Sequence, residues 1–268
     1  MSQPSTHMLD VPGARLYYEV RGTGPVLIMV GHPMGAYGFA PIAPLLAEDY
    51  TVVTFDPRGF DRSTIEDTDQ EGDPELLADD VRRVLDAVGK VPAHVFGSSG
   101  GAVTGLALVA RHPGHVASLV AHEPPVALLL PEAEEASAGI HEIYDTYRER
   151  GIGAAWERFS IFTGMDTPPA GDGDQQAPSA EMLATSDRFF GHGLLPIALY
   201  QPDLAALKAA PSRVVVGGGS SSRGQFAQRT AVALAEALDT PLVEFPGGHA
   251  GFASDPQEFA ALLRRTLS

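Results

Sequence analysis

The sequence contains no cysteine, so disulfides, thiolate metal sites and a cysteine nucleophile are all excluded. Long hydrophobic runs are also missing, because no segment approaches the roughly 18–20 apolar residues of a membrane span. Positive charge is scarce, with 18 Lys and Arg against 34 Asp and Glu and a net charge of −16 at pH 7. Nucleic acids and anionic membranes attract clustered basic side chains, so we expect neither as a partner. Residues 1–10 lack the apolar segment of a secretory signal, and we expect a cytoplasmic protein.

The 268 residues are enough for a full hydrophobic core, and 44% of them are hydrophobic. Alternating side chains predict an opening antiparallel strand over Ala14–Val20. Further apolar runs predict buried strands over Val26–Val30, Tyr50–Phe55, His94–Phe96, Val116–Ala121, Arg213–Val216 and Leu242–Phe245. Helical patterns alternate with them over Pro74–Val88, Ser99–Arg111, Gly224–Leu238 and Pro256–Thr266. This alternation is typical of an α/β fold with a mostly parallel central sheet flanked by helices.

One long segment interrupts the alternation of strands and helices. Between Pro124 and Ala210 the patterns predict helices only, over residues 132–149, 154–162 and 181–190. Between the last two lies a loop over residues 168–178, rich in Gly, Asp, Gln and Pro, which we expect to be mobile. The interpretation is a helical lid over residues 125–210, inserted between two sheet strands of a core formed by residues 1–124 and 211–268.

The pattern Gly97-Ser98-Ser99-Gly100-Gly101 is a G-x-S-x-G motif between a predicted strand and a predicted helix. Such a turn holds its serine in strained backbone, and flanking glycines avoid clashes there. The serine hydroxyl then projects beyond the sheet, above the positive end of the following helix. The motif predicts Ser99 as a nucleophile. The alternatives are a simple glycine-rich turn, or Ser98 as the reactive residue.

A proton acceptor is expected beside that serine. Of nine histidines, only His249 follows the last predicted strand, in a glycine-rich loop that permits close approach. We therefore predict His249 as the base, with a surface-loop histidine as the alternative. His112 and His115 lie beyond the helix after Ser99 and are expected to face solvent, and His94 is expected to be structural.

The acidic partner of the histidine is found by elimination. Many such enzymes carry it after the penultimate strand, here residues 214–223, but no Asp or Glu occurs between Asp203 and Glu236. The remaining position is Glu123, at the end of the strand that follows the Ser99 helix. A carboxylate there would orient the imidazole and stabilise its protonated form. The alternative is a structural role for Glu123.

Backbone N–H groups are needed to hold the negative oxygen of a reacting ester. Gly100 supplies one, and the loop after Val30 supplies the other. Pro33 has no N–H, so we assign the second donor to His32, with Met34 as the alternative backbone donor and the His32 side chain as a further possibility. Met34 and Trp156 are also candidate substrate-binding residues, although packing explains Trp156 equally well. Residues 56–63, which include Asp56, are interpreted as a buried structural turn.

Together these residues resemble the α/β-hydrolase family over essentially the whole chain. Ser99 is unlike the aspartate nucleophile of the haloalkane dehalogenases and epoxide hydrolases in that family. The pattern is more similar to the zearalenone lactonases. It shares with them Gly22-Thr23-Gly24-Pro25, Thr54-Phe55-Asp56, Arg62-Ser63, Ser98-Ser99-Gly100 and His122-Glu123 with Pro125.

That resemblance implies a triad of Ser99, His249 and Glu123, and it places Trp156 in a matching segment. Two parts of the chain depart from it. His32-Pro33 replaces an Asp-Gly pair, and residues 163–184 do not match.

The sequence thus predicts a hydrolase that cleaves a small-molecule carboxylic ester or lactone through an acyl-enzyme, without metal or cofactor. The same three residues also suit a cofactor-free haloperoxidase-like activity or the hydrolysis of a C–C bond. A third hypothesis is a ligand receptor on a hydrolase scaffold with little turnover. Nothing in the sequence indicates the oligomeric state.

Overall fold

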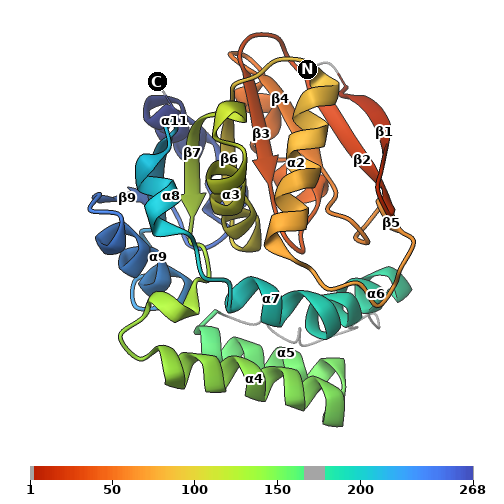
Figure 1. The fold of residues 1–268 in the computed structure, drawn as a ribbon, viewed down its shortest axis with the longest axis vertical. Helices are drawn as coiled ribbons and strands as arrows, with labels where there is room; N and C mark the ends of the chain where they lie inside the picture. The colour runs from red at the N-terminus through yellow and green to blue at the C-terminus, as the bar shows by residue number, and fades with distance from the viewer. Residues whose placement is uncertain (1–2, 166–178, 268) are drawn as a thin grey trace.

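The computed structural model describes residues 3–165 and 179–267, which form a central sheet with helices on both faces and a helical lid (Figure 1). The strands lie in the order β1-β2-β4-β3-β6-β7-β8-β9, with β5 paired to β2. All pairs from β4 to β9 are parallel, whereas β2 is antiparallel to β1, β4 and β5. The bounds are β1 Ser5–Val11, β2 Ala14–Arg21, β3 Val26–Val30, β4 Thr51–Phe55, β5 Thr64–Ile65, β6 Ala93–Ser98, β7 Val116–His122, β8 Arg213–Gly219 and β9 Leu242–Phe245. The predicted mostly parallel sheet is confirmed.

The side chains of β3 show why its sequence is apolar throughout. Ile28 packs into a core with helices α2, α3 and α9 on one face of the sheet. Its neighbours Leu27 and Met29 pack into a second core with α1 and α11 on the opposite face. Because successive side chains of a strand point to opposite faces, a sheet covered on both sides needs apolar residues at every position. These helices are α1 Ala43–Leu46, α2 Pro74–Val88, α3 Gly100–Arg111, α9 Phe226–Ala237 and α11 Pro256–Leu267.

Short helices complete the core domain. They are the 3-10 turns η1 Ala36–Phe39 and η2 Pro113–His115 and the α-helix α10 Gly251–Ser254. Two short helices at the ends of the inserted segment, η3 Ala127–Leu129 and α8 Leu204–Ala209, also contact the core helices α9 and α3. The strand β1 was not expected from the sequence, because Ser5–Val11 is polar and mostly exposed. Backbone pairing with β2 along its whole length explains this edge strand. None of the helices in the described part of the chain is long and apolar enough to cross a bilayer.

The segment between β7 and β8 folds as helices, and no strand occurs in its described residues. Between η3 and α8 it contains α4 Ala133–Arg150, α5 Ile152–Thr163, α6 Ala180–Arg188, the π-helical turn η4 Phe189–Gly193 and α7 Leu194–Ala198. Figure 1 shows these helices gathered beyond the carboxyl ends of the parallel strands. The predicted loop over residues 168–178 lies outside the described residues. The lid therefore covers the edge of the sheet where the predicted reactive residues emerge.

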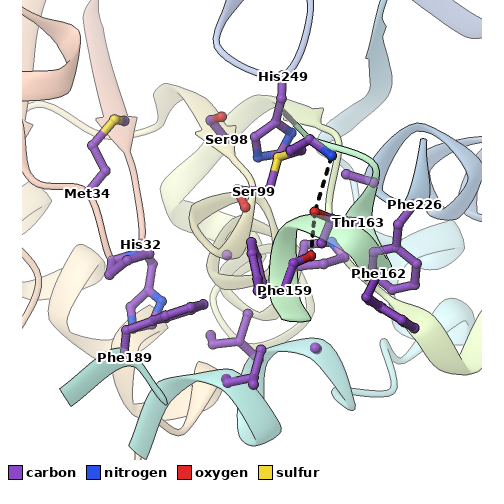
Figure 2. A pocket seen from close by; sticks show the side chains of 18 of the residues that line it. His32, Met34, Ser98, Ser99, Phe159, Phe162, Thr163, Phe189, Phe226 and His249 are labelled. Carbon is purple, nitrogen blue, oxygen red and sulfur yellow. Dashed lines mark hydrogen bonds between the residues drawn. The ribbon is translucent and has the colours of Figure 1, made fainter. Parts of the chain in front are cut away.

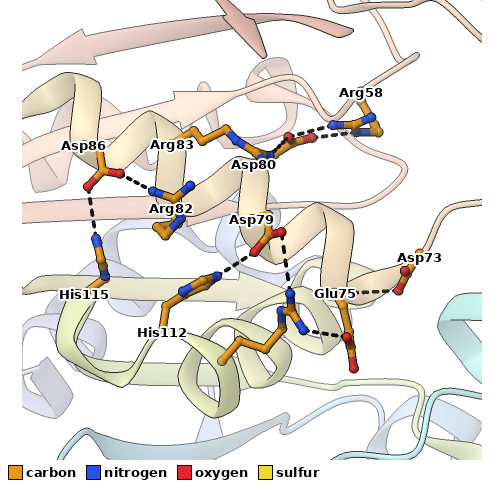
Figure 3. Close-up of polar contacts among 11 residues, drawn as sticks. Arg58, Asp73, Glu75, Asp79, Asp80, Arg82, Arg83, Asp86, His112 and His115 are labelled. Atoms are coloured by element: carbon orange, nitrogen blue, oxygen red, sulfur yellow. Dashed lines mark hydrogen bonds and ion pairs between the residues drawn. The ribbon is translucent and has the colours of Figure 1, made fainter. Parts of the chain in front are cut away.

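Charged side chains connect α2 to the elements around it (Figure 3). His112 and His115, expected to face solvent, are instead half-buried and bonded to this helix. Their Nε2 atoms lie 2.6 Å from Asp79 Oδ1 and 3.0 Å from Asp86 Oδ1, respectively. The predicted structural role of His94 agrees with its half-buried setting, where Nδ1 lies 2.8 Å from the Ser118 hydroxyl.

Candidate active site

Ser99 occupies the sharp turn between β6 and α3. Its backbone has φ 57° and ψ −127°, a conformation that a residue with a Cβ adopts only where its surroundings enforce it. The Ser99 N–H donates to the His122 carbonyl at 3.0 Å, which ties the turn to β7. A Cβ at Gly101 would lie 2.0 Å from the Val30 carbonyl oxygen. The glycine is therefore required by the close approach of α3 to β3.

The neighbouring serine is a weaker candidate. Ser98 belongs to β6 and is only 3% exposed, whereas Ser99 is partly accessible. Ser99 also immediately precedes α3, whose first N–H groups have no acceptor within the helix. The Ser99 hydroxyl therefore lies at the positive end of that helix, as the motif predicts.

Glu123 follows the last residue of β7 and is fully buried. Its Oε2 lies 2.6 Å from His249 Nδ1. Burial on its own raises the pKa of the Glu123 carboxyl, but hydrogen bonding from His249 and Ser222 outweighs it and leaves the pKa below its ordinary value. Glu123 is therefore a carboxylate at neutral pH, and it accepts a hydrogen bond from the imidazole.

His249 lies in the loop after β9, with 22% of its side chain exposed. Since its Nδ1 donates to Glu123, its Nε2 carries the lone pair and is free to accept a proton. The loop approaches β8 closely, because a Cβ at Gly219 would lie 2.7 Å from the backbone of Gly248. The glycines around the histidine thus allow the β8 and β9 ends to meet, as the sequence suggested.

The end of β8, where many related enzymes carry the acid, supplies hydrogen-bond donors instead. The Gly219 N–H donates to Glu123 Oε1 at 2.8 Å, and the Ser222 hydroxyl donates to the same oxygen. In the sequence, residues 214–223 stood out only because they contain no carboxylate. The run of three glycines and three serines was the available signal, because small residues leave backbone and hydroxyl donors open to a neighbouring acid.

Ser99 and His249 line one cavity (Figure 2). In the described part of the chain, no hydrogen bond joins Ser99 to His249. Catalytic hydrogen bonds are often long in an enzyme without substrate and tighten in the complex. The structure therefore brings the predicted nucleophile, base and acid to one edge of the sheet, with the acid–base contact already formed.

The predicted oxyanion donors also lie together. A Cβ placed on Gly100 would be 3.0 Å from the His32 carbonyl oxygen, so the loop after β3 touches the start of α3. In the described part of the chain, no protein acceptor takes the His32 N–H. The peptide bond between His32 and Pro33 is cis. Two adjacent backbone donors, His32 and Gly100, are thus available beside Ser99.

The turn at residues 56–63 supports the His32 loop. Asp56 is fully buried, and its Oδ1 accepts the Ala36 N–H at 2.8 Å. Its second oxygen accepts from Arg62 Nε at 2.7 Å. The Ser63 hydroxyl donates to the Asp56 carbonyl at 2.7 Å. This agrees with the interpretation of the segment as a buried structural turn, and it adds that the turn anchors the loop beside the nucleophile.

The cavity above Ser99 has a volume of about 240 Å³ and a mostly apolar lining. Both predicted substrate-binding residues, Met34 and Trp156, line it. The Trp156 ring also packs against Phe189 at 5.8 Å between centroids, and its Nε1 donates to the Ser186 hydroxyl at 3.1 Å. Trp156 is therefore both a packing residue of the lid and part of the cavity wall.

Further lining residues were not identified from the sequence. They are apolar and come mainly from the lid: Ile140, Ile143, Phe159, Phe162, Phe189, Leu194, Ile197 and Phe226. Figure 2 shows the phenylalanine rings and Thr163 around the space beside Ser99. Their helical spacing indicated only a buried face, and the same signal arises from ordinary packing.

Comparisons with known proteins agree with this architecture. Residues 24–160 match the model of the family described as alpha/beta hydrolase fold. The chain is 36% identical to the uncharacterized hydrolase YraK of Bacillus subtilis (strain 168), over 97% of this chain and 94% of that protein. It is 35% identical to a zearalenone hydrolase of Bionectria ochroleuca, over 44% of this chain and 46% of that protein.

Among solved structures, a thermophilic esterase from Thermogutta terrifontis superposes with a TM-score of 0.72 at 19% identity, covering 99% of this chain and 98% of that one. This structural likeness concerns the fold. The family match covers just over half of the chain, and the bacterial relative extends over nearly all of it. The expected resemblance is thus confirmed, and this chain belongs to the α/β-hydrolase family.

Proposed function

We propose that this hydrolase cleaves carboxylic esters or lactones through an acyl-enzyme on Ser99. The observation that carries the proposal is the Glu123–His249 hydrogen bond, whose imidazole lines the same cavity as Ser99. A carboxylate on Nδ1 fixes the tautomer in which Nε2 accepts a proton, and it stabilises the imidazolium that follows.

The first half of the reaction forms the acyl-enzyme. His249 Nε2 takes the Ser99 proton as the serine oxygen attacks the carbonyl carbon. The carbonyl oxygen becomes negative and is held by the N–H groups of His32 and Gly100. The bond to the leaving oxygen then breaks, and His249 returns its proton to that oxygen.

The second half releases the acid. Water loses a proton to His249 Nε2 and attacks the acyl carbon, and Ser99 leaves with that proton. In a lactone the leaving alcohol stays attached to the acyl group, so the product is a hydroxy acid. The residues present account for every proton transfer in this sequence.

The apolar lining of the cavity supports an uncharged substrate, because an unpaired charge placed there would lose its hydration without compensation. The 35% identity to a zearalenone hydrolase over 44% of this chain supports testing lactones. The 240 Å³ cavity lies slightly below the usual range for small-molecule sites.

The test is hydrolysis of p-nitrophenyl acetate and butyrate, with Ser99→Ala as the control. We expect turnover by the wild type alone, and labelling of Ser99 by a fluorophosphonate probe. A wild type no faster than Ser99→Ala, together with no labelling, would refute the proposal. A parallel screen of lactones that includes zearalenone assigns the preferred class.

A further inference from the structure

The imidazole of His32 has no hydrogen-bond partner among the residues that the structure describes. The residue is 4% exposed, and neither Nδ1 nor Nε2 has a hydrogen-bond partner within the described residues. Burial, with a contribution from the positive charge of Arg188, lowers its pKa to about 3. The ring is therefore neutral at physiological pH, with one nitrogen that donates and one that accepts.

Three glycines enclose this ring. A Cβ on Gly100 would lie 3.1 Å from Nδ1, one on Gly193 would lie 3.0 Å from Cε1, and one on Gly72 would lie 3.7 Å from Nε2. Each belongs to a different element: the start of α3, the π-helical turn of the lid and the loop before α2. The Phe60 ring meets the imidazole edge-on, at 5.1 Å between centroids. A side chain on Gly100 or Gly193 would crowd the imidazole, whereas one on Gly72 would be in ordinary contact with it.

The two spaces beside the ring differ in size. The rear space has no room for a water molecule. It lies between the ring and Arg58, Gly72, Arg188 and Gly193. The front space is the 240 Å³ cavity that contains Ser99. Figure 2 shows His32 beside Phe189 of the lid, at the margin of that cavity. Neither ring nitrogen has accessible surface in this structure, so a hydrogen-bonding partner has to enter from the cavity, with a small shift of the ring.

We propose that the His32 side chain binds a neutral hydroxyl group of the substrate, near the reacting carbonyl. This inference rests on the proposed hydrolase function and specifies its substrate class as hydroxy-substituted esters or lactones. The backbone N–H of the same residue is assigned to the carbonyl oxygen, so the group that meets the ring is only a few bonds away. Gly100, whose Cβ position is 3.1 Å from Nδ1, lines the cavity, so Nδ1 is the ring nitrogen on the cavity side.

The argument against a purely structural imidazole is energetic. A buried polar group without a partner is destabilising, whereas a hydrogen bond to substrate removes that penalty. An analogue with a methyl group in place of the hydroxyl leaves the nitrogen unpaired. The wild type is expected to prefer the hydroxy ester about tenfold in kcat/KM.

Two matched substrate pairs test this preference. One pair is p-nitrophenyl 3-hydroxybutyrate and p-nitrophenyl 3-methylbutyrate, which differ by hydroxyl against methyl in the acyl part. The other pair is 2-hydroxypropyl and 2-methylpropyl butyrate, which differ likewise in the alcohol part. The readout is the ratio of kcat/KM within each pair, because changes at His32 also affect the oxyanion loop.

The variants are His32→Asn and His32→Leu, two side chains with the same number and branching of non-hydrogen atoms. The asparagine amide replaces Nδ1, whereas leucine carries no hydrogen-bonding atom. We expect His32→Asn to retain most of the preference in at least one pair and His32→Leu to abolish it. Equal ratios in the wild type and His32→Leu, or no wild-type preference in either pair, would overturn the proposal while leaving the hydrolase intact. No turnover of any of the four esters would overturn the proposed function as well.

Discussion

His249 Nδ1 and Glu123 Oε2 lie 2.6 Å apart, although 126 positions separate the two residues in the sequence. The contact joins the end of β7 to the loop after β9, across the intervening strand β8. That strand contributes to the contact through the Gly219 N–H, which holds the other carboxylate oxygen. Three strand ends therefore determine the position of one imidazole.

The variant Glu123→Gln tests the role of this acid. Glutamine has the same shape but is neutral and favours the wrong imidazole tautomer, so we expect kcat to fall at least about 100-fold. Steady-state kinetics on p-nitrophenyl butyrate measures the effect, with Ser99→Ala as the baseline. Near-normal turnover by Glu123→Gln would mean that another group orients His249.

Ser222 is a positioning residue that acts through Glu123. Removing its hydroxyl in Ser222→Ala takes one donor from Oε1, which raises the pKa of the Glu123 carboxyl. Because the ionised acid is the active form, the acidic limb of the activity profile should move to higher pH, and kcat should fall about tenfold. The exposed Ser221 gives the matched control, Ser221→Ala, which should leave the profile unchanged. Identical profiles for the two variants would contradict this role.

Trp156 is expected to limit the length of the substrate. Replacing it in Trp156→Ala removes part of the cavity wall, so the ratio of kcat/KM for p-nitrophenyl octanoate over acetate should rise about tenfold. Ile161 lies on the same helix but is 67% exposed, and Ile161→Ala should leave the ratio as in the wild type. A ratio unchanged in Trp156→Ala would assign the ring to packing alone.

The Arg58–Asp80 pair should contribute strongly to stability. Both side chains are 1% exposed, with Arg58 Nε 2.7 Å from Asp80 Oδ2 and a second bond between the same groups at 2.8 Å. Asp80→Asn leaves the guanidinium charge buried and should lower the free energy of unfolding by about 3–5 kcal/mol. Asp86→Asn, on the exposed side of the same helix, should cost less than about 1 kcal/mol. Urea unfolding measures the loss of stability in both variants, and equal losses would contradict the stronger contribution of the buried pair.

His122 should make the fold sensitive to acid. Its ring is fully buried among aromatic side chains that include Phe96, Phe245 and Phe259. Burial lowers its pKa from 6.5 to about 4. The negative charge of Glu123 opposes this shift, and the charge of His249 adds to it. Below pH 6.5 the unfolded chain therefore binds a proton that the folded chain does not, and stability falls as the pH decreases.

The free energy of unfolding that depends on His122 decreases between pH 6.5 and about 4, by roughly 1.4 kcal/mol per pH unit and by about 3 kcal/mol in all. Urea unfolding at pH 7, 6, 5 and 4 measures it. The variant His122→Leu should show a shallower decline than the wild type over this range. His32 contributes a similar loss to both proteins because its pKa is also lowered. If stability decreased equally in the wild type and in His122→Leu, His122 would have the same pKa in the folded and unfolded states.

The main elements were predictable because burial on two faces leaves a strong apolar signal. The bounds of β3, β9 and α2 agree with those predicted, and α2 also carries an Asp73 cap and a terminal Gly89 in the left-handed region. The edge strand β1 was missed because its stability comes from backbone pairing, which leaves no hydrophobic alternation in Ser5–Val11.

In the candidate site, too, some residues could be predicted from the sequence and others could not. Ser99, Glu123 and His249 follow strands in the sequence, so parallel topology alone predicts that they meet. The donors Gly219 and Ser222 could not be predicted, since their contacts with Glu123 depend on the path of a loop. The enclosure of the His32 ring likewise depends on Gly72, Gly100 and Gly193, which lie far apart along the chain and share no motif.

The position of Glu123 also determines where the lid begins. Pro124 and Pro125 follow it directly, and the Pro124 carbonyl accepts the Thr230 hydroxyl of α9 at 2.7 Å. The acid thus lies at the junction from which the whole lid departs. A graft of a foreign lid onto this scaffold would have its first splice point beside the group that orients the imidazole. Exchanges that keep Glu123, Pro124 and their Thr230 anchor together should transfer substrate preference, whereas a splice between them should also reduce turnover of every substrate.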